Sequence, residues 1–140
     1  MQDSMCRCVN HKRVDQGCAM QFYSRKWIMP EDLNPNGSLF GGRLLSWVDA
    51  EAAIFAMCEL GQDKHLVTKF ISEINFVSSA KQGEVIEMGV EIVKVGNSSI
   101  TLHVIVRNLI TKAVIIEIDD IVFVSLDENG KPAPHGYVAA

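Results

Sequence analysis

The feature that most constrains the fold is a change of hydrophobic period along the chain. Residues 43–60 carry apolar side chains three or four positions apart, a spacing typical of an amphipathic helix. Four later stretches alternate apolar and polar residues with the period of a β-strand, beginning near residues 66, 86, 100 and 113. One more strand is predicted before the helix, over residues 21–28. The stripe predicted on the helix consists of Leu45, Val48, Ala52 and Phe55, with Glu59 next at the same spacing.

This pattern predicts an α+β fold. A lone amphipathic helix can bury its stripe only against the sheet, so we expect a curved antiparallel β-sheet wrapped around one long central helix. The spacers at Gly83, Gly96-Asn97 and 108–112 are short, which predicts that the four strands after the helix form an antiparallel meander. An interruption at Asp119-Asp120 in the last strand is typical of a β-bulge.

The chain's length of 140 residues fits one domain. Residues 1–19 lack periodicity and are expected to form a flexible N-terminal arm, residues 20–127 the domain, and residues 128–140, rich in turn formers, a C-terminal tail. The net charge of -4 without a basic block argues against a nucleic-acid partner. No apolar run is long enough for a membrane span or a signal peptide, so no membrane partner and a cytoplasmic location are expected.

The N-terminal arm holds one candidate metal site. Cys6, Cys8, His11 and Cys18 are ligand types that suit tetrahedral zinc. Their spacing differs from the paired-cysteine pattern of structural zinc sites, and the segment has no apolar residues to pack around an ion. We therefore favour a reduced, flexible arm and predict no metal site.

A second constellation lies at the start of the predicted helix. Gly41-Gly42 leaves the backbone open to another molecule where the unpaired N–H groups and the positive end of the helix dipole meet, which suits an oxyanion. Asp49 lies about two turns further on, roughly 10 Å along the axis, so a carbonyl group could fit between them. Its carboxylate could act as a general base toward water, although a carboxylate in mid-helix is also typical of a solvated surface.

The pattern N-x-x-G-x-x-F-G-G-x-L-L-x-W-x-D-x-x-A-A, residues 34–53, resembles the signature of hotdog-fold acyl-CoA thioesterases of the YciA and cytosolic acyl-CoA hydrolase type. The similarity continues through Val67-Thr68, residues 74–76, the turn at 96–99 and residues 122–132. The order of a strand, a helix and further antiparallel strands is also the hotdog order. The domain at residues 20–127 is therefore interpreted as a hotdog thioesterase domain.

The resemblance implies a role for several residues. Asp49 would be the general base or the nucleophile, and Asn34 would position water or substrate from the other subunit of a dimer. Backbone N–H groups around Gly41 and Gly42 would polarise the thioester carbonyl, and Thr68 would line the site. The turn at 96–99 would touch coenzyme A, although this sequence is also typical of an ordinary hairpin. The expected substrate-binding residues are Phe40, Gly41, Gly96, Asn97, Ser98 and Ser99.

The function implied is hydrolysis of an acyl-CoA to a free carboxylic acid and coenzyme A, without a metal or redox cofactor because coenzyme A is part of the substrate. A homodimer is implied, with trimers of dimers common among relatives. One alternative is a non-catalytic acyl-CoA or lipid-binding module of the same fold. Another is a dehydratase of this fold; such enzymes use a histidine near the helix start, and residues 34–60 contain none.

Overall fold

The computed structural model describes residues 20–61 and 65–137. These residues form one long α-helix, a short 3-10 helix and six β-strands. In chain order the elements are β1 (Gln21–Trp27), η1 (Pro30–Asp32), α2 (Gly41–Leu60), β2 (His65–Ile71), β3 (Ile74–Phe76), β4 (Val85–Val95), β5 (Ser99–Asn108) and β6 (Val114–Leu126). The predicted N-terminal arm, with its candidate zinc ligands, lies outside the described residues. No helix in the described ranges is long and apolar enough to cross a membrane.

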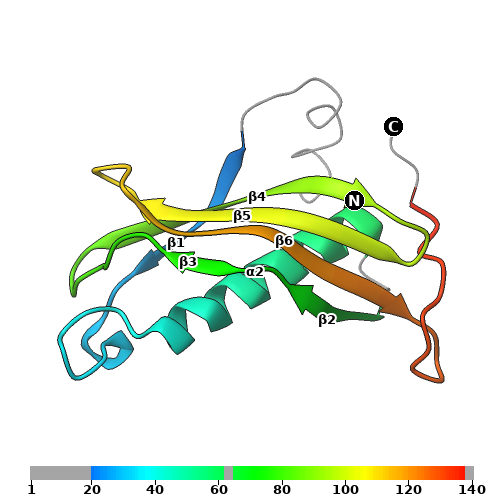
Figure 1. The fold of residues 1–140 in the computed structure, drawn as a ribbon, viewed down its shortest axis with the longest axis horizontal. Coiled ribbons are helices and arrows are strands. Elements are labelled where there is room, and N and C mark those ends of the chain that lie inside the picture. Colours follow the sequence, from blue (N-terminus) through cyan, green and yellow to red (C-terminus); the bar gives the residue numbers. More distant parts are fainter. Residues whose placement is uncertain (1–19, 62–64, 138–140) are drawn as a thin grey trace.

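All six strands belong to one antiparallel sheet, and α2 runs along one face of it (Figure 1). The strand order is β1-β4-β5-β6-β2, and β3 also pairs with β6. The fold class is therefore confirmed: a curved antiparallel sheet packs around one long helix.

The predicted meander is correct for β4, β5 and β6 but wrong for the stretch at 66–76. That stretch forms β2 and β3, which both pair with β6 instead of β4. The connection after β3 does not make a tight turn: the Ala80 carbonyl accepts a hydrogen bond from Leu39 N–H, and Gly83 N–H donates to the carbonyl of Ile28. Ile28 directly follows β1, so the start of β4 pairs with β1. The edge of β4 that β3 would need is therefore occupied by β1.

A break in the stretch at 66–76 coincides with an irregularity in β6. Ser72, between β2 and β3, exchanges two hydrogen bonds with the backbone of Asp120, one through its N–H and one through its Oγ. Opposite β5, the register of β6 gains one residue between Ile118 and Ile121. The bulge predicted at Asp119-Asp120 is therefore present, and it bends the sheet at the same height as the break between β2 and β3.

The core lies between α2 and the inner face of the sheet. The buried line on α2 recurs every four residues, with small alanines at its centre that allow close approach: Leu44, Val48, Ala52, Ala56 and Leu60. The predicted stripe overlaps this line only in part, because Leu45 and Phe55 are half-buried at its margin. The sheet contributes alternate residues, among them Ile86, Met88, Ile100, Leu102, Val104, Ile116, Ile118 and Phe123.

The segment after β6 packs back onto the domain. Ala133 N–H donates to the carbonyl of Ser125, and His135 is buried. His135 contacts the carbonyl of Ser99 through Nε2, 3.0 Å away, and its N–H donates to the carbonyl of Asn97. The predicted tail is therefore held against the turn between β4 and β5 as far as the structure describes it.

Candidate active site

The start of α2 has open backbone donors. Phe40 is the N-cap residue, and no side chain caps this helix end. The ring of Phe40 lies beside Gly42, where an added Cβ would be 2.8 Å from Cε2. An added Cβ at Gly41 would lie 3.3 Å from Cζ of Phe76. Two half-exposed aromatic rings thus flank the glycine pair. The positive end of the helix dipole favours a partly negative oxygen beside the N–H groups of these glycines.

Asn34 organises the loop in front of the helix. Its Oδ1 accepts hydrogen bonds from Asn36 N–H at 2.9 Å and Ser38 N–H at 3.2 Å. Its Nδ2 donates to Ser38 Oγ at 3.0 Å, and the turn closes at Gly37, whose φ of +82° suits glycine. The two backbone donors define the orientation of the amide. Since Nδ2 carries two protons and Ser38 takes one, Asn34 can offer the second to a ligand.

A groove of about 550 Å³ lies between this loop and residues 76–80, at the end of β3 and just after it. Its polar lining includes Asn34, Ser38 and Ser78, and its apolar lining includes Leu44 and Phe76. Gly41 also lines it, so the helix start opens into the groove. The volume lies within the range typical of small-molecule sites. Two of the predicted site residues, Asn34 and Gly41, therefore share one cavity.

Asp49 and Thr68 form a separate pair. Thr68 Oγ1, on β2, donates a 2.7 Å hydrogen bond to Asp49 Oδ1, on α2. Asp49 is half-buried and Thr68 is exposed, and neither lines the groove. Oδ2 of Asp49 has no hydrogen-bond partner within residues 20–61 and 65–137, so it remains available to accept a proton or a hydrogen bond. The chain therefore presents its two polar groups, Asn34 and Asp49, at different places.

The turn at residues 96–99 lies far from the helix start. It joins β4 to β5 at the end of the sheet near the end of α2, whereas α2 begins at the opposite end (Figure 1). Its conformation is that of a closed hairpin, in which Gly96 N–H donates to the carbonyl of Ser99. Within one chain, Gly96, Asn97, Ser98 and Ser99 are thus not brought together with Gly41 and Gly42.

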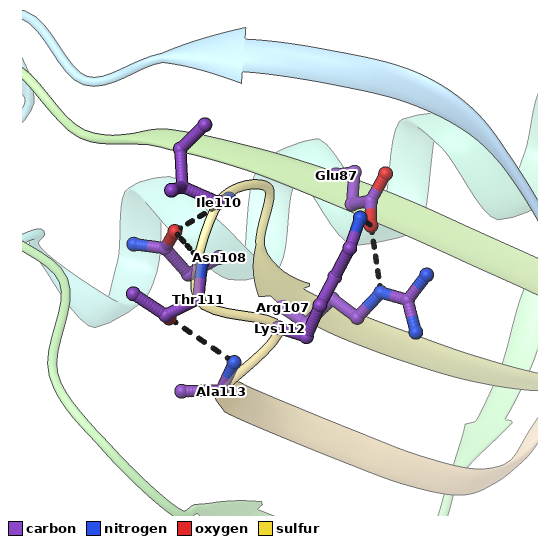
Figure 2. Close-up of polar contacts among 7 residues, drawn as sticks. All are labelled: Glu87, Arg107, Asn108, Ile110, Thr111, Lys112 and Ala113. Atoms are coloured by element: carbon purple, nitrogen blue, oxygen red, sulfur yellow. Dashed lines mark hydrogen bonds and ion pairs between the residues drawn. The ribbon is translucent and has the colours of Figure 1, made fainter.

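Polar residues on the outer face of the sheet were not singled out from the sequence. Buried Glu87 on β4 accepts hydrogen bonds from Arg107 Nε at 2.7 Å and Lys112 Nζ at 2.9 Å (Figure 2). Burial alone would raise the pKa of Glu87, but the hydrogen bonds and charges of Lys112 and Arg107 outweigh it and lower the pKa below its usual value. Figure 2 also shows Asn108 Oδ1 holding the hairpin through the N–H groups of Ile110 and Thr111.

A histidine on the same outer face lies between carboxylates. His103 contacts Glu91 Oε1 through Nδ1 at 2.8 Å and Glu117 Oε2 through Nε2 at 2.7 Å. Burial opposes its charge, yet the two carboxylates raise the pKa of His103 overall. His103, Glu117 and Asp119 also offer ligand atoms within 4.8 Å of one another. Both ring nitrogens already have carboxylate partners, so in this arrangement the ring leaves neither nitrogen unpaired for a metal ion.

Both outer-face clusters left only a weak signal in the sequence. Their members alternate with core residues along the strands, as any polar outer face does. The pairing of Glu87 with Arg107 and of Glu91 with His103 depends on the register of β4 against β5. Neither cluster lines the groove.

Comparison with known proteins connects this architecture to one family. Residues 36–115 match the family described as the thioesterase superfamily. The acyl-CoA thioester hydrolase YciA of Salmonella typhimurium is 31% identical over 122 residues, which cover 79% of this chain and 86% of that protein. The chain spans little more than half the length of two curated relatives from Buchnera aphidicola, 55% and 58% respectively.

Solved structures agree with this match. A hexameric hotdog fold thioesterase of Campylobacter jejuni superposes with a TM-score of 0.68 at 30% identity, over 79% of this chain and 86% of that chain. An acyl-CoA hydrolase of Staphylococcus aureus, solved with butyryl coenzyme A and coenzyme A, superposes with a TM-score of 0.71 at 27% identity, over 82% and 68%. Alanine variants of that hydrolase replace an asparagine and an aspartate that are 15 residues apart.

Proposed function

This chain belongs to the thioesterase superfamily and has its hotdog fold, and from that premise we propose that it hydrolyses an acyl-CoA thioester to a carboxylic acid and coenzyme A. The observation that carries the proposal is that the chain presents both an oriented carboxylate, on Asp49, and an open helix start at Gly41 and Gly42, at two places that a second copy would bring together. Asn34 precedes Asp49 by 15 residues, the separation of the asparagine and aspartate replaced in the Staphylococcus aureus hydrolase.

Each group has a defined chemical task. The carboxylate of Asp49 activates water as a general base or attacks the carbonyl as a nucleophile, and Thr68 holds one of its oxygens in place. N–H groups at Gly41 and Gly42 stabilise the oxyanion that develops on the thioester carbonyl. A thioester is already activated, so water, a carboxylate and these donors are sufficient, and no further cofactor is needed.

Asn34 acts as a donor rather than an acceptor in this scheme. Its Oδ1 is occupied by two backbone N–H groups, whereas one proton on Nδ2 remains free. It therefore binds an oxygen atom, either that of the attacking water or that of the substrate carbonyl. The ring of Phe40 lies beside Gly42, so it borders the path by which a substrate would reach the N–H groups of the helix start.

The complete site is proposed to form between two copies of the chain. Asn34 and Gly41 line the groove, while Asp49 and Thr68 lie outside it, so one chain alone does not bring the two halves together. Edge strand β2 and its neighbour β3 carry exposed apolar side chains, including Val67, Phe70 and Phe76, which a second copy would cover. A homodimer, arranged further as a trimer of dimers, accords with the hexameric Campylobacter jejuni thioesterase.

The same arrangement gives the turn at residues 96–99 a role. Because it lies at the far end of its own sheet, it would contact coenzyme A bound mainly by a neighbouring copy. The carbonyl of Ser98 accepts a hydrogen bond from Ser125 N–H, which fixes this side of the turn to β6.

The test is thiol release from acyl-CoAs of increasing chain length, followed with a chromogenic disulfide. Wild type is expected to turn over at least one substrate, and Asp49→Asn to lose about 100-fold or more of kcat while keeping its fold. Glu51→Gln, which removes a carboxylate two residues away, is the matched control and should retain activity. If wild type binds acyl-CoA yet releases no more thiol than Asp49→Asn, the chain is a binding module and the proposal is wrong.

A further inference from the structure

Asp32 is a buried carboxylate that neither the sequence pattern nor the proposed chemistry accounts for. It ends the short helix η1, two residues before Asn34, and only 7% of its surface is exposed. Charged side chains are rarely this buried unless they are paired. Its contacts therefore indicate what it does.

Asp32 contacts the chain after β1 and the start of α2 as well as lying in the loop that leads to Asn34. Its Oδ2 accepts a 2.9 Å hydrogen bond from Met29 N–H, just after β1. Its Oδ1 pairs with Arg43 Nε, 3.3 Å away in the first turn of α2. Its backbone carbonyl accepts a 2.8 Å hydrogen bond from Phe40 N–H, at the N-cap of the same helix. One residue thus ties the strand end, the loop and the helix start together.

The helix start depends on these contacts because it has no side-chain cap of its own. Arg43 is also an unfavourable residue there, since its positive charge lies at the positive end of the helix dipole. The Asp32 carboxylate offsets this repulsion, and Arg43 Nη2 makes a second contact, 3.4 Å, with the carbonyl of Glu31. Without the ion pair, the first turn of α2 would lose one of the contacts that fix it against η1, and the backbone hydrogen bond from Phe40 to Asp32 would remain.

The two groups placed in the groove lie within the segment that this ion pair closes, between residues 32 and 43. Asn34 follows Asp32 along the loop, and Gly41 precedes Arg43 in the helix. Displacing one catalytic group by about 1 Å can cost about 100-fold in rate. Resting on the function proposed above, we infer that Asp32, through its ion pair with Arg43, is a positioning residue that sets the donor of Asn34 against the N–H groups of the helix start.

The test compares Asp32→Asn with Glu31→Gln in the full chain. Asparagine can still accept the Met29 hydrogen bond but cannot form an ion pair with Arg43. The side chain of Glu31 is exposed and has no hydrogen bond or ion pair with the described part of the chain. We expect Asp32→Asn to lower kcat about 10- to 100-fold with KM within about twofold, and Glu31→Gln to leave both unchanged. Arg43→Gln should resemble Asp32→Asn, because it removes the other half of the pair.

A double-mutant cycle separates positioning from general stability. If Asp32 acts through Asn34, Asp32→Asn should cost little more kcat once Asn34→Ala is present. The inference would be overturned if the fold-losses in kcat of the two single variants multiplied in the double variant, or if Asp32→Asn were as active as wild type. Loss of melting temperature without loss of kcat would likewise assign Asp32 a purely structural role.

A second readout does not depend on turnover. The side-chain amide resonances of Asn34, observed with selectively labelled asparagine, should shift in Asp32→Asn and stay in place in Glu31→Gln. If wild type proves inactive but the Asn34 resonances shift in Asp32→Asn, the proposed function is wrong and the inference that Asp32 positions Asn34 stands. If the Asn34 resonances do not shift, Asp32 does not position Asn34, whatever the activity.

Discussion

Thr68 Oγ1 lies 2.7 Å from Asp49 Oδ1, and this hydrogen bond joins edge strand β2 to the middle of α2. It uses one carboxylate oxygen and leaves the other open. An oriented carboxylate with one free oxygen is what a general base or a nucleophile requires. Because the pair is accessible, a second copy of the chain can reach it.

Replacing Thr68 by valine should reduce activity without unfolding the domain. The change keeps the branched shape but removes a hydrogen bond to a charged group, which contributes about 1.5 kcal/mol, so kcat is expected to fall about tenfold. Thr68→Ser, which keeps the hydroxyl, should retain most activity. The measurement is thiol release at saturating acyl-CoA, and equal kcat for Thr68→Val and wild type would contradict the assigned role.

A mixture of Asn34→Ala and Asp49→Ala chains should recover activity that neither variant has alone. If each site takes Asn34 from one copy and Asp49 from the other, half of the randomly assembled dimers have one intact site, which amounts to about a quarter of wild-type turnover. The chains are mixed after unfolding and refolding together. No recovery, despite mass-spectrometric evidence for mixed dimers, would mean that both residues act from the same chain.

Gly42→Ala should separate stability from activity. Alanine favours a helix over glycine by up to about 1 kcal/mol, so the melting temperature should not fall. The new Cβ would lie 2.8 Å from the Phe40 ring and force that exposed ring to turn into the approach to the N–H groups. We expect a lower kcat/KM with an unchanged or higher melting temperature. If Gly42→Ala is as active as wild type, the substrate does not reach the site past the Phe40 ring.

The stability of the domain should depend on pH through His103. Its pKa is raised in the folded protein by Glu91 and Glu117 against the opposing effect of burial, and Asp119 lies 3.9 Å from Nε2. A group with a raised folded pKa contributes its full stability below the unfolded value of about 6.5 and loses it as pH rises through the folded value.

The measurement is the melting temperature of wild type and His103→Gln over a series of pH values. The advantage of wild type should be largest below about pH 6.5 and should shrink at alkaline pH. His65→Gln removes an imidazole for which the described residues provide no carboxylate partner, and it serves as the control. An advantage that grows with pH would mean that His103 stabilises the fold in its neutral form.

The elements with clear local periodicity were predicted well. Residues 43–60 repeat with the helical period, and the strand patterns at 86 and 100 alternate cleanly because one face is buried. The pairing of β2 and β3 with β6 was missed, because it is decided by the path of the connection past Leu39 and Ile28 and not by spacer length. Local patterns do not contain such long-range information.

The candidate site was predictable to a similar extent. Asn34, Gly41, Asp49 and Thr68 were selected through motif and resemblance, and the hydrogen bond between Asp49 and Thr68 supports two of them as a pair. Asp32 was not selected, because an acid in a loop and an arginine 11 residues later share no regular spacing. Its importance follows from burial and from three contacts that only folding creates.

The pairing of Thr68 with Phe123 in the sheet carries a consequence for synthesis on the ribosome. Thr68 emerges near the middle of synthesis, but the strand that pairs with β2, β6, is among the last parts of the domain to be made. Such distant pairings form slowly, because closing the long intervening loop costs conformational entropy before the contacts between the strands can form. Asp49 therefore acquires its partner only when the domain is nearly complete, and a nascent or prematurely terminated chain has the helix without the hydrogen bond between Asp49 and Thr68.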